Sequence, residues 1–158
     1  MYGFPYQLDY VCSLQIIEGA ADVIGDTPEG GRFHTSFKGG TVEGPRLNGV
    51  IRPGGLASSV FRPDDVLDID IRMCLEMHDS ALIYLHYRGV MDFGEGNVRR
   101  LFAGELKGKH YSHTVPRMIT SHPNYLWVNR KQFIGIGEVD LDQNIVRYDI
   151  HALESVAR

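Results

Sequence analysis

The chain has 158 residues, of which 43% are hydrophobic and 23% are charged. A chain of this size buries roughly two thirds of its unfolded surface, so we expect one domain over residues 1–158. Sixteen basic and twenty acidic residues give a formal charge of −4 without a long basic run, which argues against nucleic acid as the main partner.

Two features of the sequence bear on compartment and cross-links. The N-terminal residues lack a basic segment followed by an apolar core, and no stretch approaches the roughly 20 apolar residues of a membrane span. We therefore expect a cytoplasmic protein with no membrane partner. Cys12 and Cys74 lie far apart and outside any Cys-x-x-Cys pair, so we expect two buried, reduced thiols.

Short strands dominate the first half of the chain. The first predicted strands are Leu8 to Ile17, Arg32 to Phe37, Thr41 to Glu43, Leu47 to Ile51 and Ser59 to Arg62. From Asp68 to Met77, polar and apolar residues alternate at period two, which is typical of a strand with two different faces. Residues 78–80 have turn chemistry, and a second strand follows from Ala81 until Gly89 ends it, which predicts a hairpin.

One short helix and further strands are predicted in the second half. The helix covers residues 97–104, with Asn97 as N-cap and Gly104 as the C-terminal stop. The segment around His110 and His113 has an extended pattern, which would separate the two imidazoles, so no metal site is expected. The last two strands are Gln132 to Glu138, whose Gly-Ile-Gly indicates a bulge or a crowded barrel strand, and Asn144 to His151.

Many short strands separated by Gly, Pro, Asp and Asn favour an all-β sandwich or barrel. The richest motif is residues 39–55, Gly-Gly-Thr-Val-Glu-Gly-Pro-Arg-Leu-Asn-Gly-Val-Ile-Arg-Pro-Gly-Gly, which we read as strand, sharp bend, strand.

This motif is accompanied by three others: Met-His-Asp-Ser-Ala-Leu-Ile-Tyr at residues 77–84, Arg88-Gly89, and Asn-Tyr-Leu-Trp-Val-Asn-Arg-Lys-Gln-Phe-Ile-Gly-Ile-Gly at residues 124–137. Together they resemble the bacterial and fungal domain-of-unknown-function family numbered 3237, also called uncharacterised protein family 0311. The resemblance extends from about Tyr10 to Ile150. It implies a mainly antiparallel, closed β-barrel with an interior the size of a small molecule, and this barrel would carry the one short helix predicted above.

Arg72 is the first candidate catalytic residue. It stands mid-strand, and the resemblance implies an arginine at this position. It either belongs to a solvated outer face with Asp68, Asp70 and Glu76, or it points into the barrel and pairs with an anion there. In the second case it would stabilise a developing oxyanion.

Glu43 and Arg46 flank the bend and have two readings as well. They either tie the bend to neighbouring strands, or Glu43 acts as a general base with a pKa raised by partial burial, while Arg46 binds substrate. The remaining acid and base candidates are His86, Tyr84 and His113. Tyr84 and His86 share a strand face that is either pocket or solvent.

Aromatic residues are the candidates for substrate binding. Trp127, the only tryptophan, would plug a barrel end or form a wall for a planar ligand, and Tyr87 and Tyr111 are further candidate contacts. The resemblance also implies Asp followed by Trp where this chain has Ala57-Ser58, so a catalytic role of that Asp would be missing or relocated here. Asp65 likewise replaces a common turn glycine.

Two functions follow from these candidates. One is a cofactor-independent enzyme that isomerises, cyclises or eliminates from a small aromatic or polyketide-like metabolite by acid/base chemistry, with no cofactor and no metal. The other is a barrel that binds or senses such a molecule without converting it, or serves as a scaffold. Exposed strand edges would also allow a homodimer.

Overall fold

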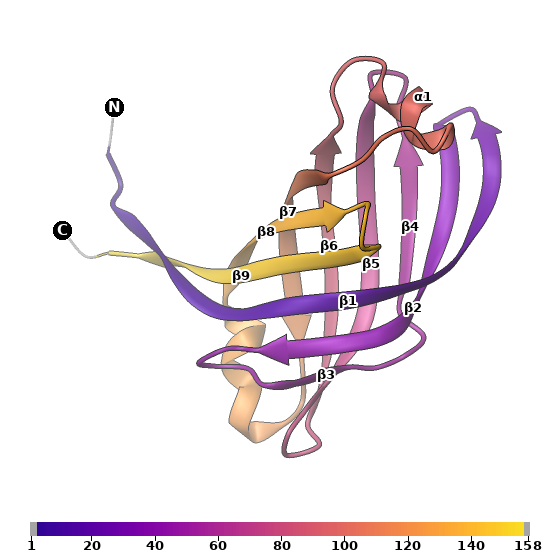
Figure 1. Ribbon diagram of the computed structural model, residues 1–158. Coiled ribbons are helices and arrows are strands. Elements are labelled where there is room, and N and C mark those ends of the chain that lie inside the picture. The colour runs from indigo at the N-terminus through magenta and orange to yellow at the C-terminus, as the bar shows by residue number, and fades with distance from the viewer. Residues whose placement is uncertain (1–2, 157–158) are drawn as a thin grey trace.

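The computed structural model describes residues 3–156, which form nine antiparallel strands, one α-helix and one 3-10 helix (Figure 1). The strands are β1 (Tyr6–Thr27), β2 (Gly30–Glu43), β3 (Gly49–Ile51), β4 (Leu56–Phe61), β5 (Val66–Met77), β6 (Leu82–Asp92), β7 (Lys109–Ile119), β8 (Gln132–Asp140) and β9 (Ile145–Ser155). The helices are α1 (Asn97–Phe102) and the 3-10 helix η1 (Pro123–Arg130).

Eight of the described strands form a closed ring. Its order is β1-β9-β8-β7-β6-β5-β4-β2, and β2 pairs with β1 to close it, while β3 lies between β2 and β5 at one end. The predicted all-β, antiparallel barrel with one short α-helix is therefore confirmed. Closure gives most strands two neighbours, which removes the exposed edges of an open sheet.

The strand pattern fixes which face of the wall is internal. On β5 the apolar residues of the alternating run are buried: Leu67, Ile69, Ile71, Met73, Leu75 and Met77. The polar residues between them face outward. On β6 the buried side chains are Ile83, Leu85, Tyr87 and Met91. The apolar face of the hairpin is thus the barrel interior, and its polar face is the outer wall.

Several predicted boundaries differ from the structure. Gly89 does not end its strand, because β6 continues to Asp92; a Cβ at Gly89 would lie 2.1 Å from the His113 carbonyl oxygen, so glycine permits a close pairing with β7. The two strands predicted within residues 32–43 form one strand with an irregularity at Gly39, whose φ is +127°. The helix η1 was not predicted. Both cysteines are free, as expected, but only Cys12 is fully buried.

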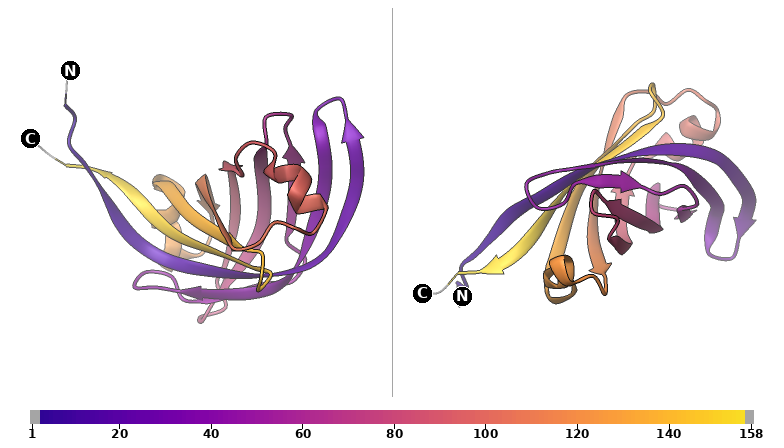
Figure 2. Two further views of the ribbon diagram at one scale, coloured as in Figure 1. Left: turned by 45° about the horizontal axis from the view of Figure 1, so that its top comes forward. Right: turned by 90° about the horizontal axis from the view of Figure 1, so that it is seen from below.

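The two helices lie at opposite ends of the barrel (Figures 1 and 2). Asn97 is not the N-cap of α1, because Gly96 takes that position with a φ of 75°. Instead, the Asp65 carboxylate accepts hydrogen bonds from the N–H groups of Gly96 at 2.8 Å and Val98 at 3.2 Å. Gly104, with a φ of +69°, follows the last turn as predicted. Within residues 3–156, neither helix has the length and apolar character to cross a membrane.

Candidate functional site

The barrel encloses a mainly apolar cavity of about 150 Å³. Its wall comes mainly from the inward residues of β2, β4, β5 and β9, with single residues from β1, β6 and β8 and Leu101 of α1. Four side chains with polar atoms interrupt this wall: Glu18, Thr35, Ser59 and Tyr148. A mostly apolar pocket with a few polar groups is the usual form of a small-molecule site.

Glu18 is the one carboxylate among the described residues that line this cavity. It lies on β1, where Leu14 and Ile16 already face the core, and it continues their face at period two. Within residues 3–156 no hydrogen-bond donor reaches its side chain, and burial raises the pKa of Glu18 above its ordinary value of 4.5. A carboxyl group in this setting is a proton acceptor better matched to neutral pH.

Tyr148 is the second titratable group in the cavity wall. Its hydroxyl accepts a hydrogen bond from the buried Ser112 hydroxyl at 3.1 Å, which leaves the Tyr148 proton free to be donated. Burial raises the pKa of Tyr148 to about 12, and the charge of Glu18 contributes in the same direction. Tyr148 therefore stays protonated near neutral pH and can act as a hydrogen-bond donor.

Tyr87 lies behind Tyr148 in the core. The two ring centroids are 5.0 Å apart, and among the described residues the Tyr87 hydroxyl has no partner that meets hydrogen-bond geometry. Burial raises the pKa of Tyr87 well above its ordinary value, with further contributions from Tyr148 and Glu18. Tyr87, one of the substrate-binding candidates from the sequence, therefore packs against a residue of the cavity wall but is not among the residues that line the cavity.

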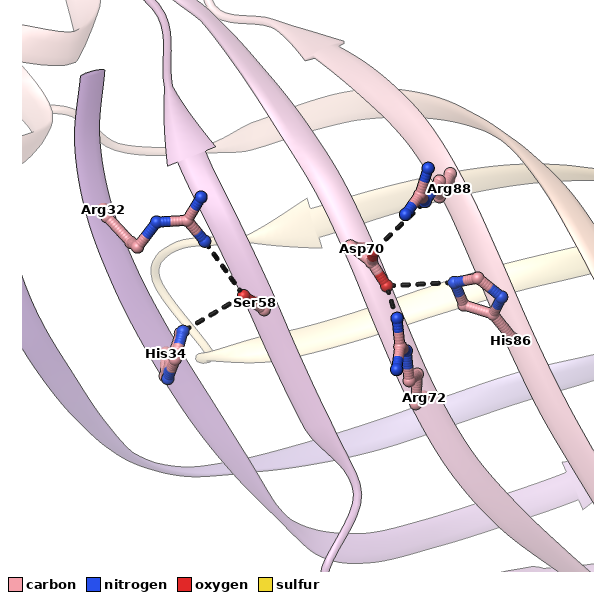
Figure 3. A network of polar contacts seen from close by, with 7 residues as sticks. All are labelled: Arg32, His34, Ser58, Asp70, Arg72, His86 and Arg88. Carbon is pink, nitrogen blue, oxygen red and sulfur yellow. Dashed lines mark hydrogen bonds and ion pairs between the residues drawn. The ribbon is translucent and has the colours of Figure 1, made fainter. Parts of the chain in front are cut away.

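The predicted catalytic residues of the β5–β6 hairpin lie on the outer wall. Asp70 joins them into one network: His86 Nε2 is 3.0 Å and Arg72 Nε is 3.5 Å from its Oδ1, and Arg88 Nε is 3.1 Å from its Oδ2 (Figure 3). Tyr84 is on the same exposed face. Arg72 and His86 thus come together, but outside the cavity.

The pKa of Asp70 reflects this network. Partial burial acts to raise it, but the His86 hydrogen bond and the positive charges of Arg72 and Arg88 outweigh that effect, so the pKa lies below its ordinary value. Asp70 therefore remains a carboxylate that holds the three basic side chains in place.

The other predicted residues are dispersed. His113 and Tyr111 face outward on β7, where Tyr111 is 62% exposed. Glu43 is exposed at the end of β2, so it lacks the partial burial on which its predicted role as a general base depended. His110 packs on Phe93 with ring centroids 5.0 Å apart, and the strand separates it from His113 as expected.

Arg46 and Trp127 meet at the end of the barrel that η1 covers. The guanidinium carbon of Arg46 lies 3.6 Å from the centroid of the Trp127 ring, and that ring packs edge-on against Phe133. The contact agrees with the reading in which the bend is tied to its neighbours. These two residues do not line the cavity.

Sequence reasoning missed Glu18, Tyr148 and Ser112. A signal for Glu18 was present, since it continues the period-two face of Cys12, Leu14 and Ile16. The same signal was present for Tyr148 on β9, because it lies at period two between the buried Val146 and Ile150. The structure also places Ala57 in the cavity wall, so an Asp at this position would face the cavity, and Glu18 supplies the only carboxylate there within the described chain.

The chain is similar to several known proteins. A UPF0311 protein of Rhodopseudomonas palustris (strain TIE-1) is 28% identical over 136 residues, covering 81% of this chain and 88% of the relative. A beta-barrel like protein from Acinetobacter baumannii superposes with a TM-score of 0.82 at 28% identity, covering 98% of this chain and all of the other (100%).

A third likeness concerns the fold alone. The structure of an enzyme from Penicillium herquei has a TM-score of 0.69 at 19% identity and covers 98% of both chains. The model of the family described as "Protein of unknown function (DUF3237)" matches residues 6–153, which is nearly the whole length. The chain therefore belongs to this family, as its glycine-rich bend and its Asn-Tyr-Leu-Trp-Val-Asn block indicated.

Proposed function

We propose that the protein is an acid/base enzyme that binds a small oxygenated ring compound in the interior cavity and isomerises it by proton transfer. The observation that carries this proposal is a carboxyl group with a raised pKa in an apolar cavity that also presents a tyrosine. A cavity of about this volume holds a single benzene-sized ring. The Penicillium herquei neighbour, described as an enzyme, makes the architecture compatible with catalysis.

Glu18 is the proton carrier in this mechanism. Its carboxylate removes a proton from the carbon that lies between a carbonyl group and a carbon–carbon double bond of the substrate, and the electron pair of that C–H bond is delocalised over a dienolate with its negative charge mainly on the carbonyl oxygen. Tyr148 donates a hydrogen bond to the enolate oxygen, while Ser112 holds the Tyr148 hydroxyl in position. The protonated Glu18 then returns the proton to a different carbon, so that the double bond is shifted and both residues are regenerated.

Binding without conversion is the second candidate function. No arginine, lysine or histidine is among the described residues that line the cavity, so an enolate would be stabilised by neutral hydroxyl groups alone. In that case Glu18 would serve as a polar anchor for a ligand hydroxyl or amine. The two candidates share the cavity and differ only in whether a bond changes.

The test uses a β,γ-unsaturated cyclohexenone as substrate and phenol as a ligand that does not react. Conversion to the conjugated enone is followed by ultraviolet absorbance, and phenol binding by thermal shift. The proteins compared are wild type, Glu18→Gln, Tyr148→Phe and the exposed control Glu95→Gln. We expect turnover to fall by roughly 10²-fold or more in Glu18→Gln and to stay unchanged in Glu95→Gln.

The outcomes separate the two functions. Turnover in wild type that disappears in a folded Glu18→Gln supports the enzyme. Phenol binding with no turnover supports the binding barrel. Phenol shifts that persist when the cavity is filled by Ala57→Leu would place the ligand elsewhere and refute both.

A further inference from the structure

The ladder between β4 and β5 is open in its middle. Leu56 and Ala57 pair with Arg72 and Ile71, and Val60 and Phe61 pair with Asp68 and Leu67. Between these pairs, residues 58–59 and 69–70 have no pairing with each other, although the register on either side is the same. The ladder is therefore interrupted here without a bulge.

A groove of about 300 Å³ lies on the outer wall at this opening. It is lined by Arg32 and Ser58 on one side and by Asp70 and Arg88 on the other (Figure 3). Ile69 lines both this groove and the interior cavity, so it lies between the two spaces. The groove is thus a separate site on the opposite side of the wall.

Arg88 presents unused donors on one side of the groove. It contacts Asp70 only through Nε, at 3.1 Å, and its side chain is 71% exposed. Within residues 3–156 its two terminal NH₂ groups have no partner, and these are the groups that bind carboxylate or phosphate oxygens in pairs. Arg72 is held in the same way, through Nε to Asp70.

Arg32 is fixed on the other side. One of its terminal nitrogens donates to Ser58 Oγ at 3.2 Å, the other is bound to Glu29, and the side chain is 28% exposed. His34 Nε2 lies 3.0 Å from the same Ser58 Oγ. When His34 donates in that bond, Ser58 accepts twice and its own O–H is free to point into the groove.

The acidic residues of the groove already have partners. Asp70 is shared by His86, Arg72 and Arg88, and Asp68 lies 3.4 Å from Arg62. A bound anion would therefore lie beside carboxylates that are already paired with basic side chains and beside guanidinium groups that still have N–H donors to offer. A bound cation would have to displace an arginine from Asp70.

We propose that this outer groove is an anion-binding site that takes a carboxylate or phosphate group between Arg32 and Arg88, with the Ser58 hydroxyl as a third donor. The site does not depend on the function assigned to the cavity. Its ligand is a small molecule that carries one such group, and the two arginines bind it from opposite sides of the opened ladder.

The experiment titrates inorganic phosphate and, separately, acetate into the protein and follows the His34 and His86 ring protons by NMR at constant ionic strength. Variants Arg88→Gln and Arg32→Gln remove one donor group each. Arg52→Gln is the matched control, because Arg52 is an exposed outer-wall arginine that pairs with Glu76 at 3.5 Å, away from the groove.

We expect saturable binding in wild type and in Arg52→Gln, and affinity at least about 10-fold weaker in each groove variant, as for the loss of a charge-assisted hydrogen bond. A preference for phosphate or for acetate identifies which oxyanion the groove suits, and either supports the site. Equal affinity in wild type and in folded Arg88→Gln and Arg32→Gln would overturn the proposal, and so would the absence of saturation with both anions.

Discussion

The ring of Tyr148 lies directly on the backbone of Gly137. A Cβ at position 137 would stand 2.2 Å from the ring's Cε1 and 2.4 Å from its Cδ1. No side chain fits in that space, so the glycine on β8 determines where the Tyr148 ring lies in the cavity wall. This explains one of the two glycines in the Gly-Ile-Gly sequence of that strand.

We expect Gly137→Ala to displace Tyr148 and to destabilise the protein by about 1–3 kcal/mol, the usual cost of overpacking a core. Gly31→Ala is the matched control, because its nearest neighbour would be 3.7 Å away and its backbone is not in the left-handed region. Urea unfolding of both variants measures the difference. Equal stabilities of Gly137→Ala and Gly31→Ala would show that the barrel wall adjusts to the added methyl group at residue 137.

Glu18→Gln should change how stability depends on pH. The folded pKa of Glu18 lies above 4.5, so the folded state holds its proton more tightly than the unfolded state does. The free energy of unfolding of the wild type should therefore fall as pH rises from the ordinary pKa through the folded one, and Glu18→Gln should not show this loss.

The measurement is the melting temperature of both proteins from acidic to neutral pH. We expect Glu18→Gln to be more stable than wild type at neutral pH, with the gap closing below the ordinary pKa. The exposed Glu95→Gln serves as control. A gap that is constant across this range would mean that Glu18 is well solvated in the folded state.

Asp65→Ala should loosen helix α1. The Asp65 carboxylate satisfies two N–H groups at the start of this helix, and loss of such a cap costs about 0.5–2 kcal/mol. Because Leu101 of α1 lines the cavity, hydrogen exchange over residues 97–103 should become faster. Asp65→Asn keeps an acceptor oxygen and tolerates the φ of 63°, so it should lie close to wild type.

Arg46→Ala should be detectable through the single tryptophan. Removal of the guanidinium group from the Trp127 face should shift the fluorescence spectrum and cost about 0.5–1 kcal/mol, as for an exposed cation–π contact. Arg130→Ala, in the last turn of η1, is the control. An unchanged spectrum in Arg46→Ala would show that the stacked arrangement is not populated in solution.

The all-β class and most strands could be predicted from residue patterns, because period-two alternation and turn residues are local signals, whereas closure of the barrel was implied by the family resemblance. The alternation in residues 68–77 identifies a strand, and its apolar face is the interior. The limits of strands were harder to predict. Gly89 resembles a strand end when only its own conformational freedom is considered, but it lies inside a strand because the neighbouring β7 approaches closely.

The cavity could be predicted only in part. Tyr84 and His86 were predicted to share a face, and Arg72 to share one with Asp70, but the sequence left open which side of the wall each face takes; the register that pairs Arg72 with His86 is known only from the structure. Glu18 was overlooked because the predicted strand ended at Ile17, and a charged residue directly after an apolar run resembles the end of that strand. The period-two position of Glu18 after Leu14 and Ile16 indicates an inward side chain, but only the structure shows that this side chain lines the same cavity as Tyr148 of β9.

That closure has a consequence for biosynthesis. Residues of β1 pair with β9 from Tyr6 opposite Ser155 to Ile17 opposite Ile145. The pairing of β1, the first strand to be synthesised, can therefore be completed only after β9 has been synthesised. Until β9 has been made, β1 can pair with β2 but not with its second neighbour. The start of β1 and the end of β9 lie side by side (Figure 1), so a linker could join the two ends of the chain and new ends could be cut into the hairpin turn at residues 78–80. In such a permuted chain β9 and β1 would be made in succession.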